Sequence, residues 1–576
     1  MSKILRINMD SLTVAEEPVR SGYSGIGGRG LTSAIVNAEV PALCHPLSGE
    51  NKLVFAPGTL AGTTAPCSGR LSVGAKSPLT GGIKESNSGG TVATALGRLG
   101  IAAIVVEGKA APGDKYVLKI DSTGARFLTA NGLKLKGNYR TANVLRRKHG
   151  RDVSVISIGP AGEMMLSAAS IAVTDPEGRP TRHAGRGGLG AVMGAKGLKA
   201  IVVDAKGTGR VAPKDEGTFR EAVKKFAKLL SEHPITGQGL PTYGTNILAN
   251  IINAVGAYPT NNFSTGKFAG VEKISGEKER ETIIARDGLP SHACHRGCVI
   301  SCSGIYMDEK KKYLTKRPEY ETVWAHGANC GIDDLDAIAR MDRLDDDIGL
   351  DTIEMGATIG VAMEAGLARF GDAKAAIKML KEVQKGTPLG RILGSGAKVT
   401  GQAFGVVRVP VVKGQALPAY DPRAAKGIGV TYATSPMGAD HTAGYSITAN
   451  VLNVGGTVNP LSPEGQVALS RSLQIATAAL DSTGLCLFVA FCVLDQPEAL
   501  EAIVGMIGGL RGKKFSTDDF TALGKKILKM ERDFNARAGF TVADDRLPRF
   551  FLTEKLSPHE AVFDVPDSEL DTVFSF

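Results

Sequence analysis

The sequence predicts an α+β fold, in which a β-rich N-terminal domain is followed by two mainly α-helical domains. Three observations support this class. The chain has 576 residues, more than one hydrophobic core normally accommodates, so several domains are expected. Short β-like runs separated by Gly and Pro turns occupy the sequence up to about residue 205. From Thr218 onward, apolar residues recur at helical spacing instead.

The first domain is predicted to span residues 1–206. Its strands are expected where apolar and β-branched residues cluster or alternate between turns. The expected strands are Ile4–Asn8, Lys52–Phe55, Ala102–Glu107, Tyr116–Ile120, Val153–Ile156 and Ala200–Asp204. A polar stretch with Gly207, Gly209 and Pro213 then predicts a linker ahead of the helical part.

Two helical domains are predicted, over residues 207–412 and 413–576. The boundary between them is set near Pro418 and Pro422, where the helical period is interrupted. The expected helices have apolar residues three and four positions apart. They are Thr218–Leu230, Asp334–Ile348, Asp351–Ala368, Ala373–Val383, Pro463–Ala479, Pro497–Ile507 and Thr517–Ala536.

Composition restricts the classes of function. Hydrophobic residues make up 43% and charged residues 22% of the chain, which is typical of a globular protein. The net charge of +10 would suit an anionic partner, but aromatic residues are only 5% and do not interleave with basic ones, so nucleic-acid binding is not expected. No apolar run is long enough to span a membrane and Met1–Asp10 reads as a strand, so a cytoplasmic protein without membrane association is predicted.

Three of the eight cysteines are clustered. Cys294, Cys298 and Cys302 follow one another at intervals of four residues. Disulfides are rare in a reducing compartment, whereas three thiolates in one loop can bind an iron–sulfur cluster whose fourth ligand is distant in sequence. Cys486 and Cys492 are candidates for that fourth position. Zinc is the alternative, because a neighbouring histidine would complete a tetrahedral site, and the spacing leaves both metals open.

Glycine is unusually frequent, with 72 residues, and the pattern G-x-G-x-x-G begins at both Gly25 and Gly185. At that frequency roughly one match is expected by chance, so the pattern is weak support for a dinucleotide-binding domain. The prolines and charges before Gly185 also exclude the buried strand that such a domain needs. Arg186–Gly190 is interpreted as a turn that binds an anion before a helix at Ala191. A purely structural turn is the alternative.

The pattern D-x-x-G-L-[D/C] occurs at Asp346–Asp351 and again at Asp481–Cys486. Each copy follows a long helical segment. The repeat predicts two equivalent loops that hold two similar ligands, or two halves of one ligand. The alternative is coincidence, or that each glycine only ends its helix.

Several polar residues are candidates for binding or acid–base chemistry. Arg70 and Asn87 lie in Gly- and Ser-rich segments of the first domain. Glu319, Glu321 and His441 have side chains of the type that transfers protons in enzymes. Considered singly, each is more often a surface or turn residue.

Together these features resemble the aldehyde:ferredoxin oxidoreductase family, over nearly the whole chain. The resemblance rests on Gly185–Lys196, the three clustered cysteines, Glu319–Thr322 and both D-x-x-G-L-[D/C] loops, which occur in the family's order. It implies that the β-rich domain forms the base of a cofactor site that the two helical domains cover. It also implies two pterins that share one tungsten, with molybdenum as an alternative, and one 4Fe-4S cluster nearby.

The resemblance further implies roles for individual residues. The ligands of the 4Fe-4S cluster would be Cys294, Cys298, Cys302 and Cys486. The residues that bind the pterin cofactor would be Arg70, Asn87, Arg186, Gly187, Asp346, Leu350, Asp481 and Leu485. The acid–base pair would be Glu321 and His441, with Glu319 as the nearest alternative carboxylate.

Within the pterin-binding set, the two aspartates would accept hydrogen bonds from the pterin rings, helped by the backbone at the two leucines. Arg70 and Arg186 would bind pterin phosphates. Asn87 and the carbonyl of Gly187 would help to coordinate a Mg2+ that bridges those phosphates, since hard oxygen ligands suit a hard cation.

The implied reaction is the oxidation of an aldehyde to a carboxylic acid, with electrons passed through the cluster to ferredoxin or a ferredoxin-like subunit. The basic turn Asp308–Tyr313 would attract such an acidic partner, although runs of this kind are more often solvated turns. Two features depart from the family pattern. Three residues, not two, separate Cys294 from Cys298, and no E-x-x-H motif is present, so an oligomer bridged by iron is not expected.

Three other functions stay open from the sequence. The first is a related tungsten- or molybdenum-pterin oxidoreductase that acts on another low-potential substrate, for example in aromatic-ring reduction. The second is a nicotinamide-dependent dehydrogenase with a structural zinc. The third is a cluster protein that only relays electrons.

Overall fold

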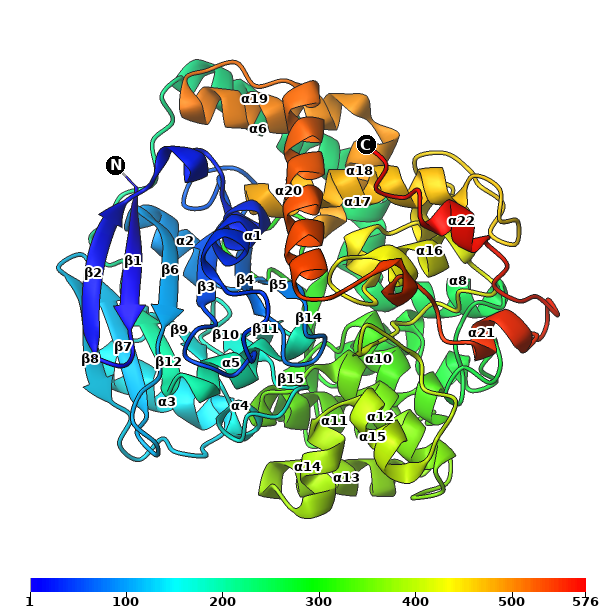
Figure 1. Ribbon diagram of the computed structural model, residues 1–576. Helices are drawn as coiled ribbons and strands as arrows, with labels where there is room; N and C mark the ends of the chain where they lie inside the picture. Colours follow the sequence, from blue (N-terminus) through cyan, green and yellow to red (C-terminus); the bar gives the residue numbers. More distant parts are fainter. Residues whose placement is uncertain (1) are drawn as a thin grey trace.

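Two six-stranded sheets form the N-terminal part of the protein, in a computed structural model that describes residues 2–576. Helices make up most of the remainder and pack against one side of these sheets, as the blue and cyan strands and the green to red helices of Figure 1 show. This arrangement confirms the predicted α+β class with a β-rich N-terminal part.

The two sheets have similar topology. The first has the order β2-β1-β6-β3-β4-β5 and the second the order β11-β10-β9-β12-β7-β8. Each contains a single parallel pair, β1 with β6 and β7 with β12. The strands of the first sheet are β1 (Lys3–Asn8), β2 (Thr13–Pro18), β3 (Leu53–Pro57), β4 (Leu71–Lys76), β5 (Ile83–Ser88) and β6 (Ile101–Glu107). Those of the second are β7 (Tyr116–Asp121), β8 (Gly124–Thr129), β9 (Ser154–Ser157), β10 (Ile171–Val173), β11 (Arg182–Ala184) and β12 (Leu198–Val203).

All six expected strands occur, because their apolar runs are buried within the sheets. The N-terminal part also contains helices, of which only the one near Ala191 was expected. They are α1 (Gly28–Glu39), α2 (Val92–Arg98), α3 (Asn138–His149), α4 (Pro160–Glu163) and α5 (Leu189–Ala195). Two glycines in the first turn of α1 lower its helix propensity, so this helix depends on its packing against β4 and the C-terminal helix α20.

All seven expected helices are present in the C-terminal part. Their ends follow local signals, since Asp334 caps α11 and Ser516 with Asp519 forms a capping box at α20. The longer helices are α6 (Glu216–Glu232), α8 (Leu248–Ala254), α9 (Gly276–Ala285), α10 (Tyr320–His326), α11 (Leu335–Ile348), α12 (Thr352–Glu364), α13 (Ala373–Lys385), α14 (Pro388–Gly394), α15 (Ala397–Phe404), α16 (Lys426–Thr434), α17 (Gln466–Thr483), α18 (Ala490–Asp495), α19 (Pro497–Arg511) and α20 (Thr517–Arg537). Single-turn helices are α7 (Leu240–Tyr243), α21 (Phe550–Thr553) and α22 (Asp567–Leu570).

Small sheets interrupt the helical part where only helices were expected. The strands β13 (Leu289–His292), β14 (Ser303–Met307) and β15 (Tyr313–Lys316) form a three-stranded antiparallel sheet, and the clustered cysteines lie in the loop between β13 and β14. A second hairpin pairs β16 (Val411–Val412) with β17 (Gln415–Ala416). The cysteine loop is therefore held at both ends by a hairpin.

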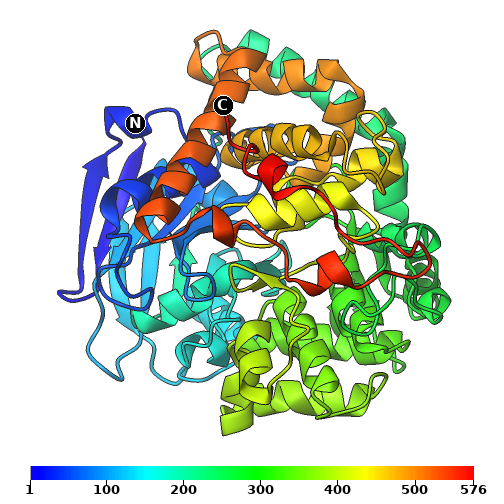
Figure 2. The same cartoon turned by 45° about the vertical axis from the view of Figure 1, so that its right-hand side comes forward.

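Segments far apart in the sequence pack together. The helix α6 lies along α19, and α20 crosses both α1 and α17, as both views of Figures 1 and 2 show. A helix from the predicted second domain thus contacts one from the predicted third, and the division into three domains stays a prediction. None of the helices between residues 2 and 576 combines the length and apolarity that crossing a membrane requires.

Candidate cluster and cofactor site

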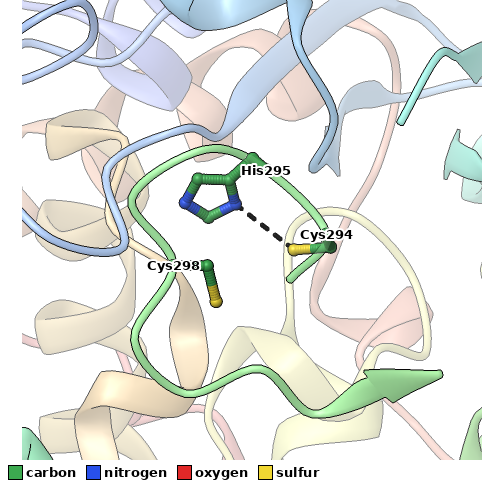
Figure 3. A group of neighbouring side chains, drawn as sticks. All are labelled: Cys294, His295 and Cys298. Carbon is green, nitrogen blue, oxygen red and sulfur yellow. Dashed lines mark hydrogen bonds between the residues drawn. The ribbon is translucent and has the colours of Figure 1, made fainter. Parts of the chain in front are cut away.

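The loop between β13 and β14 brings two of the clustered thiols together. The sulfurs of Cys294 and Cys298 and one ring nitrogen of His295 lie within 4.8 Å of one another. Figure 3 shows these three side chains directed into the same loop. Cys294 and Cys302 are buried and Cys298 is partly exposed. Within the same loop, the N–H of Ser301 donates to the sulfur of Cys298 over 3.4 Å.

Cys486 lies close to the cysteine loop in space, although it is almost two hundred residues away in the sequence. Its backbone N–H donates to the carbonyl of Cys67 over 2.9 Å, and the N–H of Cys67 donates to the carbonyl of Gly297 over 2.9 Å. Cys486 shares an apolar cluster with Cys302. Burial raises the pKa of the Cys486 thiol to about 12. The segment of Cys486 therefore lies beside the cysteine loop, and Cys67, which the sequence did not single out, links the two segments by backbone hydrogen bonds.

The other candidates for this site are engaged elsewhere. The sulfur of Cys492 lies 3.6 Å from Oε1 of Gln496 on the next turn of chain. His292 is 3.0 Å from a carboxylate oxygen of Glu177. His295 alone remains, with Nδ1 3.2 Å from the sulfur of Cys294. A set of four thiols suits an iron–sulfur cluster, and it would also suit zinc.

The two D-x-x-G-L-[D/C] loops are equivalent in structure. Each begins in the last turn of a long helix, α11 or α17, and each glycine ends its helix in a left-handed conformation, Gly349 with φ 81° and Gly484 with φ 84°. Each also packs against a glycine that follows a strand of the sheets. A Cβ atom at Gly159 would lie 2.1 Å from the carbonyl oxygen of Ile348, and one at Gly58 would lie 2.0 Å from the amide nitrogen of Gly484.

The aspartates of the two loops have basic partners. Nζ of Lys316 lies 2.9 Å from Asp346 and Nε2 of His183 lies 3.1 Å from the same carboxylate. Burial acts against ionisation of Asp346, but these two partners outweigh it and hold the pKa of that carboxyl below its ordinary value. Asp481 is 3.3 Å from the guanidinium of Arg29. Burial nevertheless raises the pKa of Asp481 to about 6.

The two leucines of these loops are buried, Leu350 at 2% and Leu485 at 1% exposure. Their N–H groups already have partners within the chain, since Leu350 donates to the carbonyl of Asp345 and Leu485 donates to the hydroxyl of Thr483. These contacts fix the loop shapes.

Arg70 lies between the cysteines and the first sheet. Its N–H donates to the carbonyl of Gly484 over 3.0 Å, and its side chain donates to Oδ1 of Asn87. A Cβ atom at Gly89 would lie 3.3 Å from both the guanidinium of Arg70 and the sulfur of Cys294. Arg70 therefore contacts the loop of Asp481 and faces the predicted cluster.

Arg186 and Gly187 form a tight turn ahead of α5. Gly187 has φ 82° and its carbonyl accepts a hydrogen bond from the hydroxyl of Ser77 over 2.7 Å. The guanidinium of Arg186 donates to the carbonyls of Ala439 and Ala416 over 2.7 and 2.6 Å. These hydrogen bonds connect the turn to the helical part of the protein. A loop that closes a site between the N-terminal sheets and the helical part would make such contacts.

Glu321 and His441 come together from separate helices. Glu321 is in the first turn of α10 and His441 begins a short 3-10 helix, yet Oε1 of Glu321 is 3.4 Å from Nε2 of His441. The second oxygen of Glu321 accepts from the N–H of Ala419 over 3.0 Å. Glu319 points elsewhere, because its carboxylate binds the hydroxyl of Thr245 over 2.9 Å.

The pKa values of this pair are shifted in opposite directions. Burial raises the pKa of Glu321 to about 8, despite the hydrogen bond from Ala419 and the nearby charge of Arg186. Burial lowers the pKa of His441 to about 4, despite the neighbouring carboxylate of Asp440. At neutral pH the histidine is therefore uncharged, and the carboxyl group is able to exchange a proton.

A buried ion pair adjoins His441. Nζ of Lys84 lies 3.2 Å from Oδ2 of Asp440, and the stem of Lys84 covers Gly187. Burial acts against the charge on Asp440, but Lys84 and Arg186 hold the pKa of this carboxyl well below its ordinary value. Lys84 belongs to no sequence motif. Only the position of Asp440 next to His441 could have drawn attention to the pair.

Aromatic rings surround the acid–base pair. The rings of Tyr420 and Tyr445 lie 6.0 and 6.1 Å from the ring of His441, and their hydroxyls are 2.7 Å apart. Three buried polar atoms here have no hydrogen-bond partner among the residues that the structure describes: Oε1 of Glu321, Nδ1 of His441 and the hydroxyl of Tyr432. Such atoms are costly unless a bound group satisfies them, so the region fits a polar substrate or cofactor.

Family models match almost the entire chain. A model described as "Aldehyde ferredoxin oxidoreductase, N-terminal domain" matches residues 4–205, and one described as "Aldehyde ferredoxin oxidoreductase, domains 2 & 3" matches residues 221–574. The boundary between the two matches coincides with the expected linker.

Individual relatives agree with these models. A tungsten-containing aldehyde ferredoxin oxidoreductase from Pyrococcus horikoshii is 37% identical, over 96% of this chain and 92% of its own length. Its counterpart from Pyrococcus furiosus is 36% identical over the same shares. An aliphatic sulfonate oxidoreductase, WOR-like subunit, from Pyrococcus furiosus is 24% identical over 95% of this chain and 88% of its own length.

A solved structure shares the fold. The active site complex BamBC of benzoyl coenzyme A reductase, in complex with 1,5 dienoyl-CoA, superposes with a TM-score of 0.81. The match covers 100% of this chain and 93% of that one, at 19% identity. At this identity the likeness concerns the fold alone.

Proposed function

Since the chain belongs to the aldehyde ferredoxin oxidoreductase family, we propose that it oxidises aldehydes to carboxylic acids at a tungsten bis-pterin centre and passes the electrons through a 4Fe-4S cluster to ferredoxin or a ferredoxin-like subunit. One observation carries the proposal. The loop that begins at Asp481 ends at Cys486, so a single short segment would contact both the pterin and the cluster.

The residues present fit these cofactors. The proximity of Cys294 to Cys298, and the burial of Cys302 and Cys486 in one apolar cluster, support these four residues as cluster ligands. The equivalent packing of the two helix-end loops supports Asp346 and Asp481 as acceptors for two similar pterin rings, with the backbone at Leu350 and Leu485 shaping the loops. We infer that Arg70 contacts both cofactors, because it lies beside Cys294 and the loop of Asp481.

The phosphates of the pterins would lie near the turn of Arg186. The remaining N–H groups of Arg186 would donate to them. Asn87 and the carbonyl of Gly187 would coordinate the bridging Mg2+, since a carbonyl oxygen that accepts one hydrogen bond keeps a second lone pair. Molybdenum in place of tungsten is the alternative for the redox metal.

The overall reaction is RCHO + H2O → RCOOH + 2 H+ + 2 e−. The bound tungsten centre would take up the two electrons that aldehyde oxidation releases. The protein supplies proton transfer and positioning. Glu321, once deprotonated, would accept a proton from the water that adds to the carbonyl. Neutral His441 would orient Glu321 or the substrate through Nε2, and the rings of Tyr420 and Tyr445 would limit access of bulk water.

Metal and activity measurements test the proposal together. Protein purified without oxygen should contain tungsten or molybdenum together with iron, and should reduce ferredoxin when an aldehyde is added. Protein that contains zinc as its only metal would contradict the proposal. The ring-reducing alternative has less support, because it rests on a likeness of fold at 19% identity.

The pH dependence of kcat/KM should report Glu321. We expect kcat/KM to rise with pH along one limb with an apparent pKa near 8, because the base form of Glu321 increases as pH rises through that value. His441 should contribute no inflection between pH 5 and 7, since its pKa is about 4. Residual activity of Glu321→Gln should lack the limb. A profile that falls as pH rises through 8 would refute the base role.

An acidic redox partner would approach the cluster from the cysteine loop. Arg296 and Val299 are exposed on either side of Cys298, which is itself partly exposed. The basic turn at Lys310 lies at the far end of β14, roughly 17 Å along the strand at its usual rise. Its neighbour Lys311 is already paired with Asp287. We infer that Arg296 contributes more to docking than this turn does.

Charge reversal distinguishes the two sites. Arg296→Glu should slow the reduction of an acidic ferredoxin by about 10-fold at low salt, and the difference should shrink as salt screens the charges. Lys310→Glu serves as the control and should have a smaller effect. Stopped-flow kinetics at several ionic strengths would measure both. Equal rates for Arg296→Glu and the wild type at low salt would rule out docking at the loop.

The eight cysteines are free thiols, which supports a reducing compartment such as the cytoplasm. Any oligomer is proposed to form without an iron between subunits, because the chain has no E-x-x-H motif.

A further inference from the structure

The start of helix α1 packs against the loop that begins at Asp481. A Cβ atom at Gly28 would lie 2.2 Å from the carbonyl oxygen of Asp481, and the N–H of Gly30 donates to the hydroxyl of Ser482 over 3.0 Å. Both glycines lie within the first of the two G-x-G-x-x-G patterns in the sequence. Here the pattern allows two backbone segments to approach closely, because glycine has no side chain to keep them apart.

Arg29, which lies between these two glycines, contacts the carboxylate of Asp481. Its Nη1 is 3.3 Å from Oδ2 of Asp481. Its Nε and Nη2 donate to the two carboxylate oxygens of Glu531, on α20, over 2.9 and 2.8 Å. Glu531 also accepts from the hydroxyl of Ser33 on α1, over 2.8 Å. A bidentate pair of this kind fixes the plane of the guanidinium, so Arg29 meets Asp481 in one orientation.

The three side chains in this row of contacts differ in exposure. Those of Arg29 and Glu531 are 3% and 0% exposed, whereas 15% of the side chain of Asp481 is exposed. The contact with Arg29 uses Oδ2 of Asp481 and leaves Oδ1 available to a ligand. The row therefore runs from a buried carboxylate on α20, through a buried cation, to the one carboxylate that has an open side.

The loop of Asp346 has a comparable arrangement. Nζ of Lys316 lies 2.9 Å from Asp346 and 2.7 Å from Asp342, a fully buried carboxylate on α11. In both loops one buried cation thus links the first aspartate of the D-x-x-G-L-[D/C] pattern to a second buried carboxylate on a helix. The two cations come from different elements, α1 and β15. The recurrence favours a role in what the two aspartates have in common over a chance contact.

We propose that Arg29 is a positioning residue for the pterin cofactor: it holds the carboxylate of Asp481 in the orientation that accepts a hydrogen bond from a pterin ring, and Glu531 holds Arg29 in place. This inference rests on the pterin site of the proposed function. Arg29 acts through Asp481. Without the guanidinium, this carboxylate would lose both the contact that orients it and the cation that compensates its charge in a largely buried place, so the pterin would be bound less tightly.

The test measures how fast the holoenzyme, purified without oxygen, releases its pterin in urea well below the unfolding midpoint. Released pterin is detected by its fluorescence after oxidation, and circular dichroism confirms that the protein stays folded. The variants are Arg29→Gln, Asp481→Asn and the double variant. Arg6→Gln is the matched control, because Arg6 forms a bidentate pair with Glu39, at the other end of α1, over 2.6 and 2.8 Å.

Arg29→Gln should release pterin about 10-fold faster than the wild type, on the scale by which residues that orient a ligand-binding group change affinity. Asp481→Asn should have at least that effect. The double variant should be little faster than Asp481→Asn, because the two residues act as one unit. Arg6→Gln should release pterin at the wild-type rate.

A wild-type release rate in Arg29→Gln would overturn the inference. It would also be overturned if the effects of the two substitutions multiplied in the double variant, or if Arg6→Gln accelerated release as much as Arg29→Gln, since a purely structural role would produce either result. If Arg29→Gln does not fold, Glu531→Gln takes its place in the same comparison with the same expected outcomes. A wild-type protein that contains no pterin would contradict the proposed function instead.

Discussion

Glu321→Gln is expected to lower kcat for aldehyde oxidation by about 10²- to 10⁴-fold, the usual contribution of a general acid–base group. The amide keeps the size of the side chain and can still interact with Ala419 and His441, but it cannot accept the proton released when water adds to the carbonyl. Tungsten and iron content should stay at the wild-type level. Steady-state kinetics combined with metal analysis would measure both.

Glu319→Gln is the matched control, because it makes the same chemical change two residues away. The carboxylate of Glu319 binds Thr245 and lies 3.5 Å from Arg182, on a different side of the helix start. We expect this variant to keep kcat within a few-fold of the wild type. Full turnover in Glu321→Gln, or a collapse confined to Glu319→Gln, would show that the wrong carboxylate has been assigned.

Cys486→Ala is expected to remove the cluster. Even residues that only support a metal ligand change metal affinity by about 10- to 100-fold, so loss of a ligand should have at least that effect. Iron and sulfide content and the broad visible absorbance should fall together, and aldehyde-dependent ferredoxin reduction should be lost. Iron analysis and absorption spectroscopy provide the measurement.

Cys492→Ala is the control for that variant. Cys492 is buried only a few residues further along the chain, but its sulfur contacts Gln496 and none of the clustered thiols. Its cluster content should match that of the wild type. If Cys492→Ala lost iron while Cys486→Ala kept it, the two candidates for the fourth ligand would have to be exchanged.

The sequence predicted those parts of the protein that local pattern determines. The strand β6 is an unbroken apolar run between turns, and α11 and α17 carry both helical periodicity and a terminal glycine. These signals act over a few residues, so element types could be assigned. The helix α1 was missed because its glycine-rich start has low propensity and its stability comes from α20, almost five hundred residues away.

The candidate site was predictable to the extent that its residues form short motifs. Cys294, Cys298 and Cys302 share one loop, and Asp481 and Cys486 share another. Lys84 and Cys67 belong to no such motif, because only tertiary folding brings Lys84 next to Asp440 and Cys67 next to Gly297 and Cys486. Burial likewise decides which of two neighbouring glutamates faces His441, and no sequence pattern contains that information.

The backbone contacts Gly58–Gly484 and Gly159–Gly349 restrict how this enzyme can diversify. The two backbone segments touch at both places with no space for a side chain, so neither natural variation nor directed evolution can add a side chain there without displacing the proposed cofactor-binding loops. The aromatic rings of Tyr420 and Tyr445 beside His441 are side chains, so they can be exchanged while the main chain stays in position. Substitutions that change the preferred aldehyde should therefore occur at Tyr420 and Tyr445, and the four contacting glycines should remain invariant among descendants.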